Sequence, residues 1–168
     1  PNCSRQKHRE ALFTRIREVA VAIATGRAEV EEVDRLNVYW ATMEARRRAV
    51  EALPIAAAHV LVDGKRRIAD CRLAQTPVVG GDAYSASIAA SSIIAKVTRD
   101  SLMMEYGRLY PEYGFQRHKG YGTADHMAAL GRLGPLALHR RSYMPVWNAS
   151  GLKQQLEFWA QSELGTAR

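Results

Sequence analysis

The sequence predicts an α/β domain, because segments with the apolar spacing of helices alternate with short apolar runs typical of buried strands. The two predicted strands cover residues 58–62 and 76–79, and helical patterns flank them. The chain has 168 residues, of which 47% are hydrophobic and 24% charged, as in an ordinary globular domain with one core. Neither an internal repeat nor a low-complexity linker divides it.

Helical segments precede the first strand. Apolar residues recur at helical spacing over residues 10–24, and Gly26 is the expected stop of that helix. A short helix is expected over residues 30–36. Asn37 is the expected N-cap of a further helix, which ends before Pro54.

Each predicted strand leads to a carboxylate at or just past its C-terminal end. Asp63 follows the first strand, and Asp82 follows the second across two glycines. A long helix is then expected over residues 83–110, and its Ala, Ser and Ile side chains would let it pack closely on a sheet. Thr123 is the expected cap of another helix, which ends at Gly134. A last amphipathic helix is expected over residues 152–164.

The charge of the chain favours a polyanionic partner. Its formal net charge is +7 and its pI is about 9.7. Eight Lys and Arg residues against four acids lie between positions 96 and 141. The two cysteines provide neither a disulfide framework nor a zinc site, which favours a reducing cytoplasm. No stretch has the apolar length of a membrane span or of a signal peptide core.

Asp63 and Asp82 are the candidate metal ligands. In phosphodiester hydrolysis, two divalent ions about 4 Å apart, held by carboxylates, activate water and stabilise the leaving oxygen. Mg²⁺ prefers such oxygen ligands. The alternative is structural, with Asp63 as a turn residue and Asp82 as a helix cap. Asp100 would lie about 27 Å from Asp82 along a straight helix, so it is better interpreted as an ion-pair partner of Arg99 or its neighbours.

A basic and aromatic segment around Tyr121 suits a nucleic-acid backbone. The Tyr121 hydroxyl could sense a ribose 2′-hydroxyl, and Arg117 and Lys119 could pair with phosphates. Lys96 could also reach a phosphate, or its stem could cover apolar surface. The alternative is a solvated basic loop whose tyrosine packs on the domain.

Two histidines near this segment, His118 and His139, could shuttle protons. The more ordinary interpretation is that each is a hydrogen-bonding residue at the surface.

Several motifs, in the same order along the chain, resemble bacterial ribonuclease HII. The similar segments run from about residue 9 to residue 146, and they are 26–28, 34–37, 41–42, 48–50, 63–64, 81–82, 90–100, 113–115, 118–123 and 139–146. The resemblance implies an RNase H-like three-layer fold, with a mixed sheet flanked by helices and with C-terminal helices. Residues 1–146 would form the catalytic domain and residues 147–168 a helical extension.

The implied activity is that of an endonuclease using Mg²⁺ or Mn²⁺. Such an enzyme hydrolyses the RNA strand of RNA/DNA hybrids and incises DNA at embedded ribonucleotides, which links it to DNA repair. It leaves 5′-phosphate and 3′-hydroxyl ends. A cytoplasmic monomer without a membrane partner is expected.

The resemblance also assigns residues. Asp63 and Asp82 match the third and fourth members of the acidic set that binds the metals, so both would be catalytic. Tyr121 matches the tyrosine that stacks on the ribose and recognises the RNA-to-DNA junction. Together with Tyr121, the predicted substrate-binding residues are Lys96, Arg117, His118 and Lys119.

The chain departs from the family pattern in places. The family opens with a strand carrying Asp-Glu-x-Gly-Arg-Gly-Pro, which supplies the first two metal ligands, and this chain contains no such motif. Gly80 stands where the family usually has Lys, and Ala89 where it often has Ser. The expectation is therefore a fold without its leading strands, and a chain that is inactive or very weak by itself. Two alternatives are a non-catalytic RNA/DNA hybrid-binding protein and a small α/β protein whose basic surface serves solubility.

Overall fold

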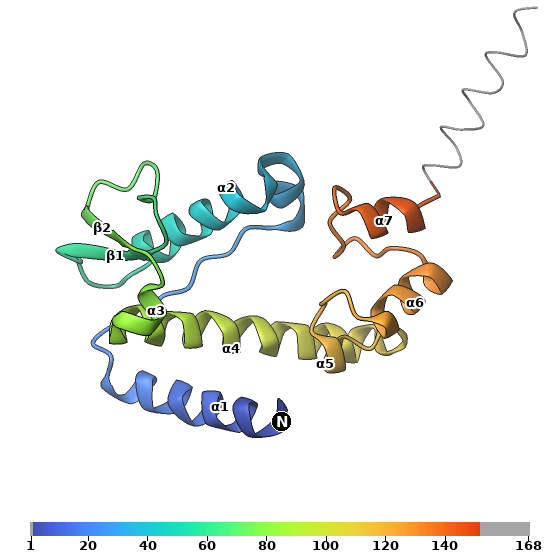
Figure 1. Cartoon of the computed structure of the whole chain (residues 1–168), viewed down its shortest axis with the longest axis horizontal. Helices are drawn as coiled ribbons and strands as arrows, with labels where there is room; N and C mark the ends of the chain where they lie inside the picture. The colour runs from blue at the N-terminus through green and yellow to red at the C-terminus, as the bar shows by residue number, and fades with distance from the viewer. Residues whose placement is uncertain (1, 152–168) are drawn as a thin grey trace, which may run out of the picture. The chain divides into compact units, whose positions relative to one another are not determined.

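The structure is a computed structural model that describes residues 2–151 (Figure 1). Its elements, in chain order, are α1 (Asn2–Val19), α2 (Val30–Glu51), β1 (His59–Asp63), β2 (Ala74–Val78), α3 (Gly81–Tyr84), α4 (Ala86–Leu109), the 3₁₀ helix η1 (Pro111–Tyr113), α5 (Phe115–His118), α6 (Ala124–Leu133) and α7 (Met144–Ala149). The helix expected over residues 152–164 lies outside the described residues.

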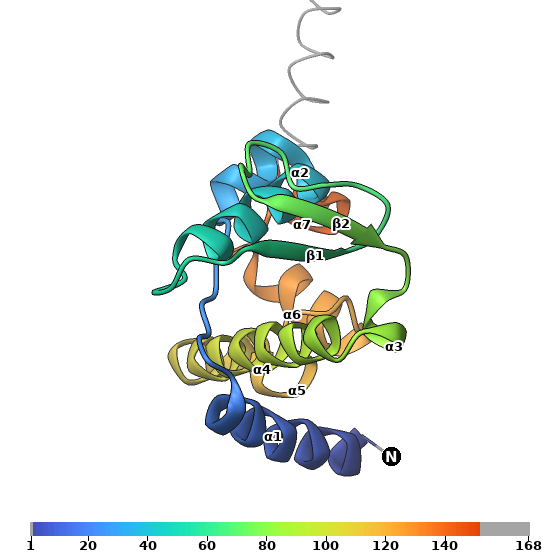
Figure 2. The ribbon, with the colours of Figure 1, turned by 90° about the vertical axis from the view of Figure 1, so that its left-hand side faces the viewer.

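The chain forms two compact units. The first comprises the residues up to 29 together with 36–102, and the second comprises residues 30–35 together with those from 103 onward. In the first unit, the strands lie between the second part of α2 and the beginning of α4 in both views (Figures 1 and 2). This helix–strand–helix layering confirms the predicted α/β class.

Strands β1 and β2 pair in parallel, and Asp63 is the register partner of Val78. Both strands lie within two residues of their predicted bounds. Only Val62 of β1 is fully buried, whereas Leu61 is 44% exposed, so the strand buries one face. Residues 2–151 contribute this parallel pair alone, and the antiparallel strand that a mixed sheet requires is not among them.

Asn37 caps a helix as predicted. Helix α2 breaks at this residue, whose φ is 67°. Its Oδ1 accepts hydrogen bonds from the backbone amides of Tyr39, at 2.9 Å, and Trp40, at 3.3 Å. The two predicted helices thus follow each other directly, and the second ends at Glu51, before Pro54.

Gly26 has a different role from the predicted one. Helix α1 ends at Val19, because the run that follows contains the β-branched residues Val21 and Ile23, which are poor helix formers. Gly26 instead lies against the backbone of α2. A Cβ at this position would stand 2.0 Å from the carbonyl oxygen of Ala45 and 2.6 Å from the amide nitrogen of Ala49.

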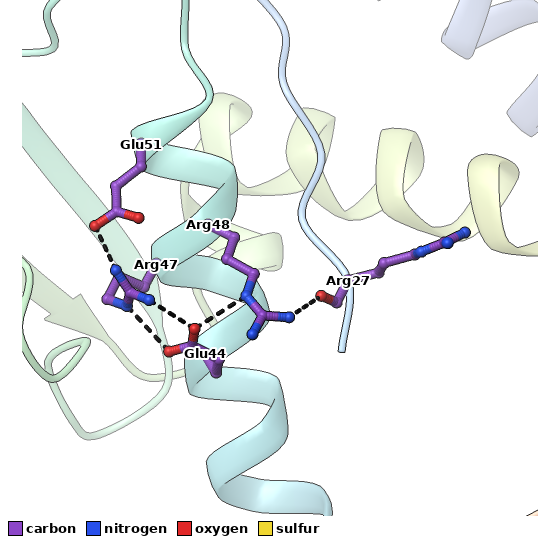
Figure 3. A network of polar contacts seen from close by, with 5 residues as sticks. All are labelled: Arg27, Glu44, Arg47, Arg48 and Glu51. Atoms are coloured by element: carbon purple, nitrogen blue, oxygen red, sulfur yellow. Dashed lines mark hydrogen bonds and ion pairs between the residues drawn. The ribbon is translucent and has the colours of Figure 1, made fainter. Parts of the chain in front are cut away.

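An ionic network on α2 supports this contact (Figure 3). The Glu44 carboxylate accepts hydrogen bonds from Arg47 and, at 2.9 Å, from Arg48. Arg48 also donates to the carbonyl oxygen of Arg27 at 2.8 Å, which ties the segment beside Gly26 to the helix. The hydrogen bond from Arg47 outweighs partial desolvation and lowers the pKa of Glu44.

The long helix predicted over residues 83–110 is divided in the structure. Helix α3 is a single turn, and Ser85 takes extended dihedral angles of −128° and 119° before α4 begins at Ala86. The Ser85 hydroxyl lies 3.4 Å from the amide of Ile88, so it satisfies a donor at the start of α4. The predicted end before Pro111 is confirmed.

In the second unit, an aromatic cluster forms the core. Tyr113 and Phe115 stack with centroids 5.4 Å apart, and Ala129 of α6 is buried with them. The Tyr113 hydroxyl donates to the carbonyl oxygen of Gly134 at 2.7 Å. Thr123 caps α6 as predicted, since its hydroxyl accepts from the amide of His126.

We expect Gly26→Ala to destabilise the protein by about 3 kcal/mol, the upper end of the usual cost of overpacking, because rigid backbone atoms occupy the space of the new methyl group. Denaturant unfolding measures the change. Gly131→Ala is the matched control. It lies inside α6 with open space around it, so the same substitution should stabilise the helix by about 0.5–1 kcal/mol. Equal stability of the wild type and Gly26→Ala would contradict the close approach.

Candidate active site

The carboxylate of Asp63 accepts a hydrogen bond from the backbone amide of Gly81 at 2.9 Å. This contact joins the end of β1 to the residue directly before Asp82. Parallel pairing makes it possible, because β2 ends beside β1 and the amide of Gly64 donates to the carbonyl oxygen of Val78 at 2.9 Å. The two predicted metal ligands therefore lie at the same end of the strand pair.

Arg46 is a neighbour of Asp63 that sequence reasoning missed. Its guanidinium donates to the backbone carbonyl oxygen of Asp63 at 3.0 Å. An open groove of about 490 Å³ in the first unit begins there and is lined by residues that include Val38, Met43, Arg46, Asp63, Lys65 and Arg66. The lining thus combines apolar side chains of α2 with three basic residues and Asp63. Spacing along α2 gave no signal for this contact, which depends on how α2 packs.

Asp82 is exposed in the first turn of α3. The N-cap of this turn is Gly80, with φ at 65°, and no side chain caps it, so Asp82 does not serve as the helix cap. Asp63 lies within β1 rather than in the turn that follows. Neither aspartate therefore has the structural role of the alternative interpretation, which made Asp63 a turn residue and Asp82 a helix cap.

The two aspartates fit part of a metal site. Carboxylate oxygens are ligands that Mg²⁺ and Mn²⁺ accept. Within residues 2–151, however, no group of three or more His, Cys, Asp or Glu side chains is arranged to hold a metal. Asp63 and Asp82 would therefore need additional oxygen ligands to complete a coordination shell.

Lys96 and Asp100 form an ion pair within α4. The Lys96 ammonium lies 2.6 Å from the Asp100 carboxylate, and Arg99 lies 3.7 Å from it. This confirms the interpretation of Asp100 as an ion-pair partner.

The basic segment lies in the second unit, around α5. Tyr121 is 55% exposed, and its amide donates to the carbonyl oxygen of His118 at 2.8 Å. Arg117 is exposed and pairs with Asp125 at 3.5 Å. The Lys119 ammonium donates to the carbonyl oxygen of Gln116 and to the sulfur of Met104. More than half of Tyr121 is thus exposed to solvent, whereas the alternative interpretation had this tyrosine packed on the domain.

The prediction that His118 and His139 lie at the surface is wrong. Their exposed fractions are 7% and 8%, and His126, which sequence reasoning missed, is 5% exposed. His118 stacks on His126 with centroids 4.3 Å apart, and Phe115 packs edge-on against both rings. The rings complete the aromatic core, which is why they are buried.

The hydrogen bonds of the three histidines define one consistent set of neutral tautomers. The amide of Leu136 donates to Nδ1 of His139 at 3.0 Å, so the proton of the neutral His139 ring is on Nε2. This Nε2 donates to Nε2 of His126 at 3.3 Å. Nδ1 of His126 then donates to the carbonyl oxygen of Tyr121 at 3.0 Å. Buried histidines thus hold the backbone of the exposed tyrosine.

His118 uses both ring nitrogens within the unit. Its Nδ1 accepts from the amide of Gly120 at 3.2 Å, and its Nε2 donates to the carbonyl oxygen of Tyr113 at 2.7 Å. Burial lowers the pKa of His126 and of His139, and the charge of the neighbouring histidine lowers each further. For His126 and His139, the neutral state that the hydrogen bonds require is therefore also the favoured one.

The fold is that of a known class of nuclease. A search of solved structures finds the ribonuclease H2 of Pyrococcus horikoshii OT3, with a TM-score of 0.72 and 20% sequence identity. The match covers 88% of this chain and 77% of the archaeal one. It confirms the predicted RNase H-like fold.

The family model of ribonuclease HII matches residues 4–146, and the chain belongs to that family. Ribonuclease HII of Anaeromyxobacter sp. (strain Fw109-5) is 55% identical over 147 residues, which are 88% of this chain and 46% of the relative. Ribonuclease HII of Koribacter versatilis is 45% identical, and the match covers 95% of this chain and 62% of the relative. Ribonuclease HII of Geobacillus thermodenitrificans is 52% identical, and the match covers 86% of this chain and 55% of the relative. The chain thus spans about half the length of the curated relatives it matches.

None of the helices in residues 2–151 combines the length and the apolar character that crossing a membrane requires.

We expect the second unit to lose stability as the pH falls below about 6.5, the ordinary pKa of histidine. The folded state keeps His126 and His139 neutral, so the unfolded state binds protons first and acid favours it. Denaturant unfolding between pH 8 and pH 5 measures this slope. His126→Gln should flatten the slope, whereas His8→Gln, at an exposed position in α1, should leave it unchanged. A wild-type stability that rises on acidification through this range would contradict the neutral histidine network.

Proposed function

We propose that this chain acts in a metal-dependent endoribonuclease, which hydrolyses the RNA strand of RNA/DNA hybrids and incises DNA at embedded ribonucleotides. Family membership supports this proposal, and the observation that carries it is the hydrogen bond between Asp63 and the amide of Gly81. It places the Asp63 carboxylate beside the residue that leads into Asp82. The proposed setting is a cytoplasmic monomer that serves DNA repair.

Asp63 and Asp82 are the proposed catalytic residues and the proposed ligands of Mg²⁺ or Mn²⁺. When bound, such ions activate water and stabilise the leaving oxygen of a phosphodiester. The amide of Gly81 donates to one oxygen of the Asp63 carboxylate, Oδ1, at 2.9 Å. Arg46 holds the backbone of Asp63 through its carbonyl oxygen, and the amide of Gly81 holds the carboxylate.

Tyr121 is the proposed contact to the ribose, and Arg117, Lys119 and Lys96 are the proposed contacts to phosphates. The exposure of the Tyr121 ring supports its part in this assignment. The three cations already have protein partners, so each would exchange one partner for a phosphate oxygen. For His118 we propose a supporting role in place of direct substrate contact, because its buried ring fixes the amide of Gly120 next to Tyr121.

We expect the 168-residue chain to cleave a duplex with one ribonucleotide very slowly in Mg²⁺, because two aspartates alone hold divalent ions weakly. Extending the chain at its N-terminus with a strand of the pattern Asp-Glu-x-Gly-Arg-Gly-Pro should raise the cleavage rate by at least about 100-fold. Gel analysis of a labelled duplex measures both rates. Rapid cleavage by the 168-residue chain, unchanged by the extension, would contradict this expectation.

Asp63→Asn should lower the cleavage rate of the extended chain by at least about 100-fold, because the amide keeps an acceptor for Gly81 but removes the charge that binds a metal. Asp70→Asn is the control, since Asp70 is an exposed aspartate of the same unit away from the strand ends. Its rate should equal that of the wild type. Full activity of Asp63→Asn would exclude this aspartate as a catalytic residue.

The competing function is non-catalytic binding of RNA/DNA hybrids, which the exposed Tyr121 and the basic segment also support. A binder would keep its hybrid affinity, with the salt dependence of phosphate contacts, and would show no Mg²⁺-dependent turnover even in the extended chain. Cleavage that requires both Mg²⁺ and Asp63 would decide for the nuclease.

A further inference from the structure

Asp34 holds together two parts of the second unit that are far apart in sequence. Its Oδ2 accepts from the backbone amide of Arg141 at 2.8 Å. Its Oδ1 accepts from the amide of Ser142 at 3.0 Å and from the Ser142 hydroxyl. A single carboxylate thus receives three hydrogen bonds from a segment 107–108 residues away.

The charge of Asp34 is suited to this contact. Desolvation tends to raise its pKa, but the hydrogen bonds from Ser142 and Arg141 and the charge of Arg140 together lower it. The carboxylate therefore stays ionised at neutral pH, and hydrogen bonds to an ionised acceptor are about twice as strong as those between neutral groups.

The residues that Asp34 holds form a turn that reaches the Tyr121 loop. The amide of Tyr143 donates to the carbonyl oxygen of Arg140 at 3.1 Å, and the Arg140 guanidinium lies over the Tyr143 ring at 5.4 Å. The Tyr143 hydroxyl lies close to Gly122, since a Cβ there would be 3.2 Å from that oxygen. Gly122 directly follows Tyr121.

Tyr121 is thus held from two directions within the second unit. His126 fixes its carbonyl oxygen from the core, at 3.0 Å. Tyr143 abuts the next residue, and Tyr143 belongs to the turn that Asp34 holds. Neither contact involves the tyrosine ring, and Tyr121 is 55% exposed.

We propose that Asp34 is a positioning residue for Tyr121: its carboxylate fixes the turn over residues 140–143, and this turn sets the place of the Tyr121 ring for ribose recognition. The inference rests on the proposed function, because it assumes that Tyr121 contacts the ribose. It adds a residue that touches neither the substrate nor a metal ligand. Loss of the carboxylate would free the turn and with it the residue after Tyr121.

The test compares the affinity of the full chain for two duplexes, one all-DNA and one with a single ribonucleotide, in Ca²⁺ to prevent cleavage. Asp34→Ala should lower the preference for the ribonucleotide duplex by about tenfold, because the turn loses all three of its hydrogen bonds to the carboxylate. Affinity for the all-DNA duplex should stay the same. Asp34→Asn should have an intermediate effect, because its single carbonyl oxygen can keep the two bonds to Ser142 and loses the one to Arg141.

Two controls separate positioning from a general loss of structure. Glu105→Gln removes an exposed acid of the same unit and should leave the preference unchanged. In a Tyr121→Ala background, Asp34→Ala should have no further effect on the preference, because the ring that it positions is absent. Amide hydrogen exchange should become faster at Arg141 and Ser142, whose amides donate to Asp34, in Asp34→Ala and stay slow at the buried Leu130 of α6.

If the wild type shows no preference for the ribonucleotide duplex, the proposed function fails, and the inference fails with it. If the wild type shows the preference and Asp34→Ala keeps it, only the inference is overturned. An equal loss of affinity for both duplexes, or additive effects of Asp34→Ala and Tyr121→Ala on the preference, would also overturn it.

Discussion

The hydrogen bond from the amide of Gly81 to the Asp63 carboxylate is the constraint on which the candidate active site depends. It links the end of β1 to the turn that follows β2, and it requires the parallel register in which Asp63 lies opposite Val78. Arg46 fixes the backbone of the same aspartate from α2. Two strands and one helix therefore determine where a single carboxylate points, and the position of Asp82 follows from its place in the chain after Gly81.

In the second unit, polar contacts inside an aromatic core have the corresponding role. Three buried histidines form hydrogen bonds that are mutually consistent only when all three are neutral, and two of these bonds end on the backbone around Tyr121. In the described part of the chain, no fully buried side-chain nitrogen or oxygen is left without a partner. When every buried polar group has a hydrogen-bond partner, the native arrangement of the side chains is favoured over other arrangements. Breaking any of these hydrogen bonds would leave a desolvated polar group without a partner.

Features with a local cause could be predicted from the sequence. Both strands, the caps at Asn37 and Thr123 and the pairing of Asp100 follow from short-range patterns, and the motifs led to the correct family. Features that depend on packing were missed: the burial of His118 and His139, and the approach of Gly26 to α2. For the candidate site, the two aspartates could be predicted from their positions after the strands, and the basic residues from the distribution of charge. The contacts of Arg46 and Asp34 could not, because they join distant segments.

The two-stranded sheet has a practical consequence for work with this polypeptide. Within residues 2–151 each strand has a single neighbour, so one row of amide and carbonyl groups on each side lacks a strand partner. Such rows are templates for pairing between molecules. Purification at high protein concentration would therefore favour aggregation, and co-expression with a peptide able to add a strand should improve the yield of soluble material.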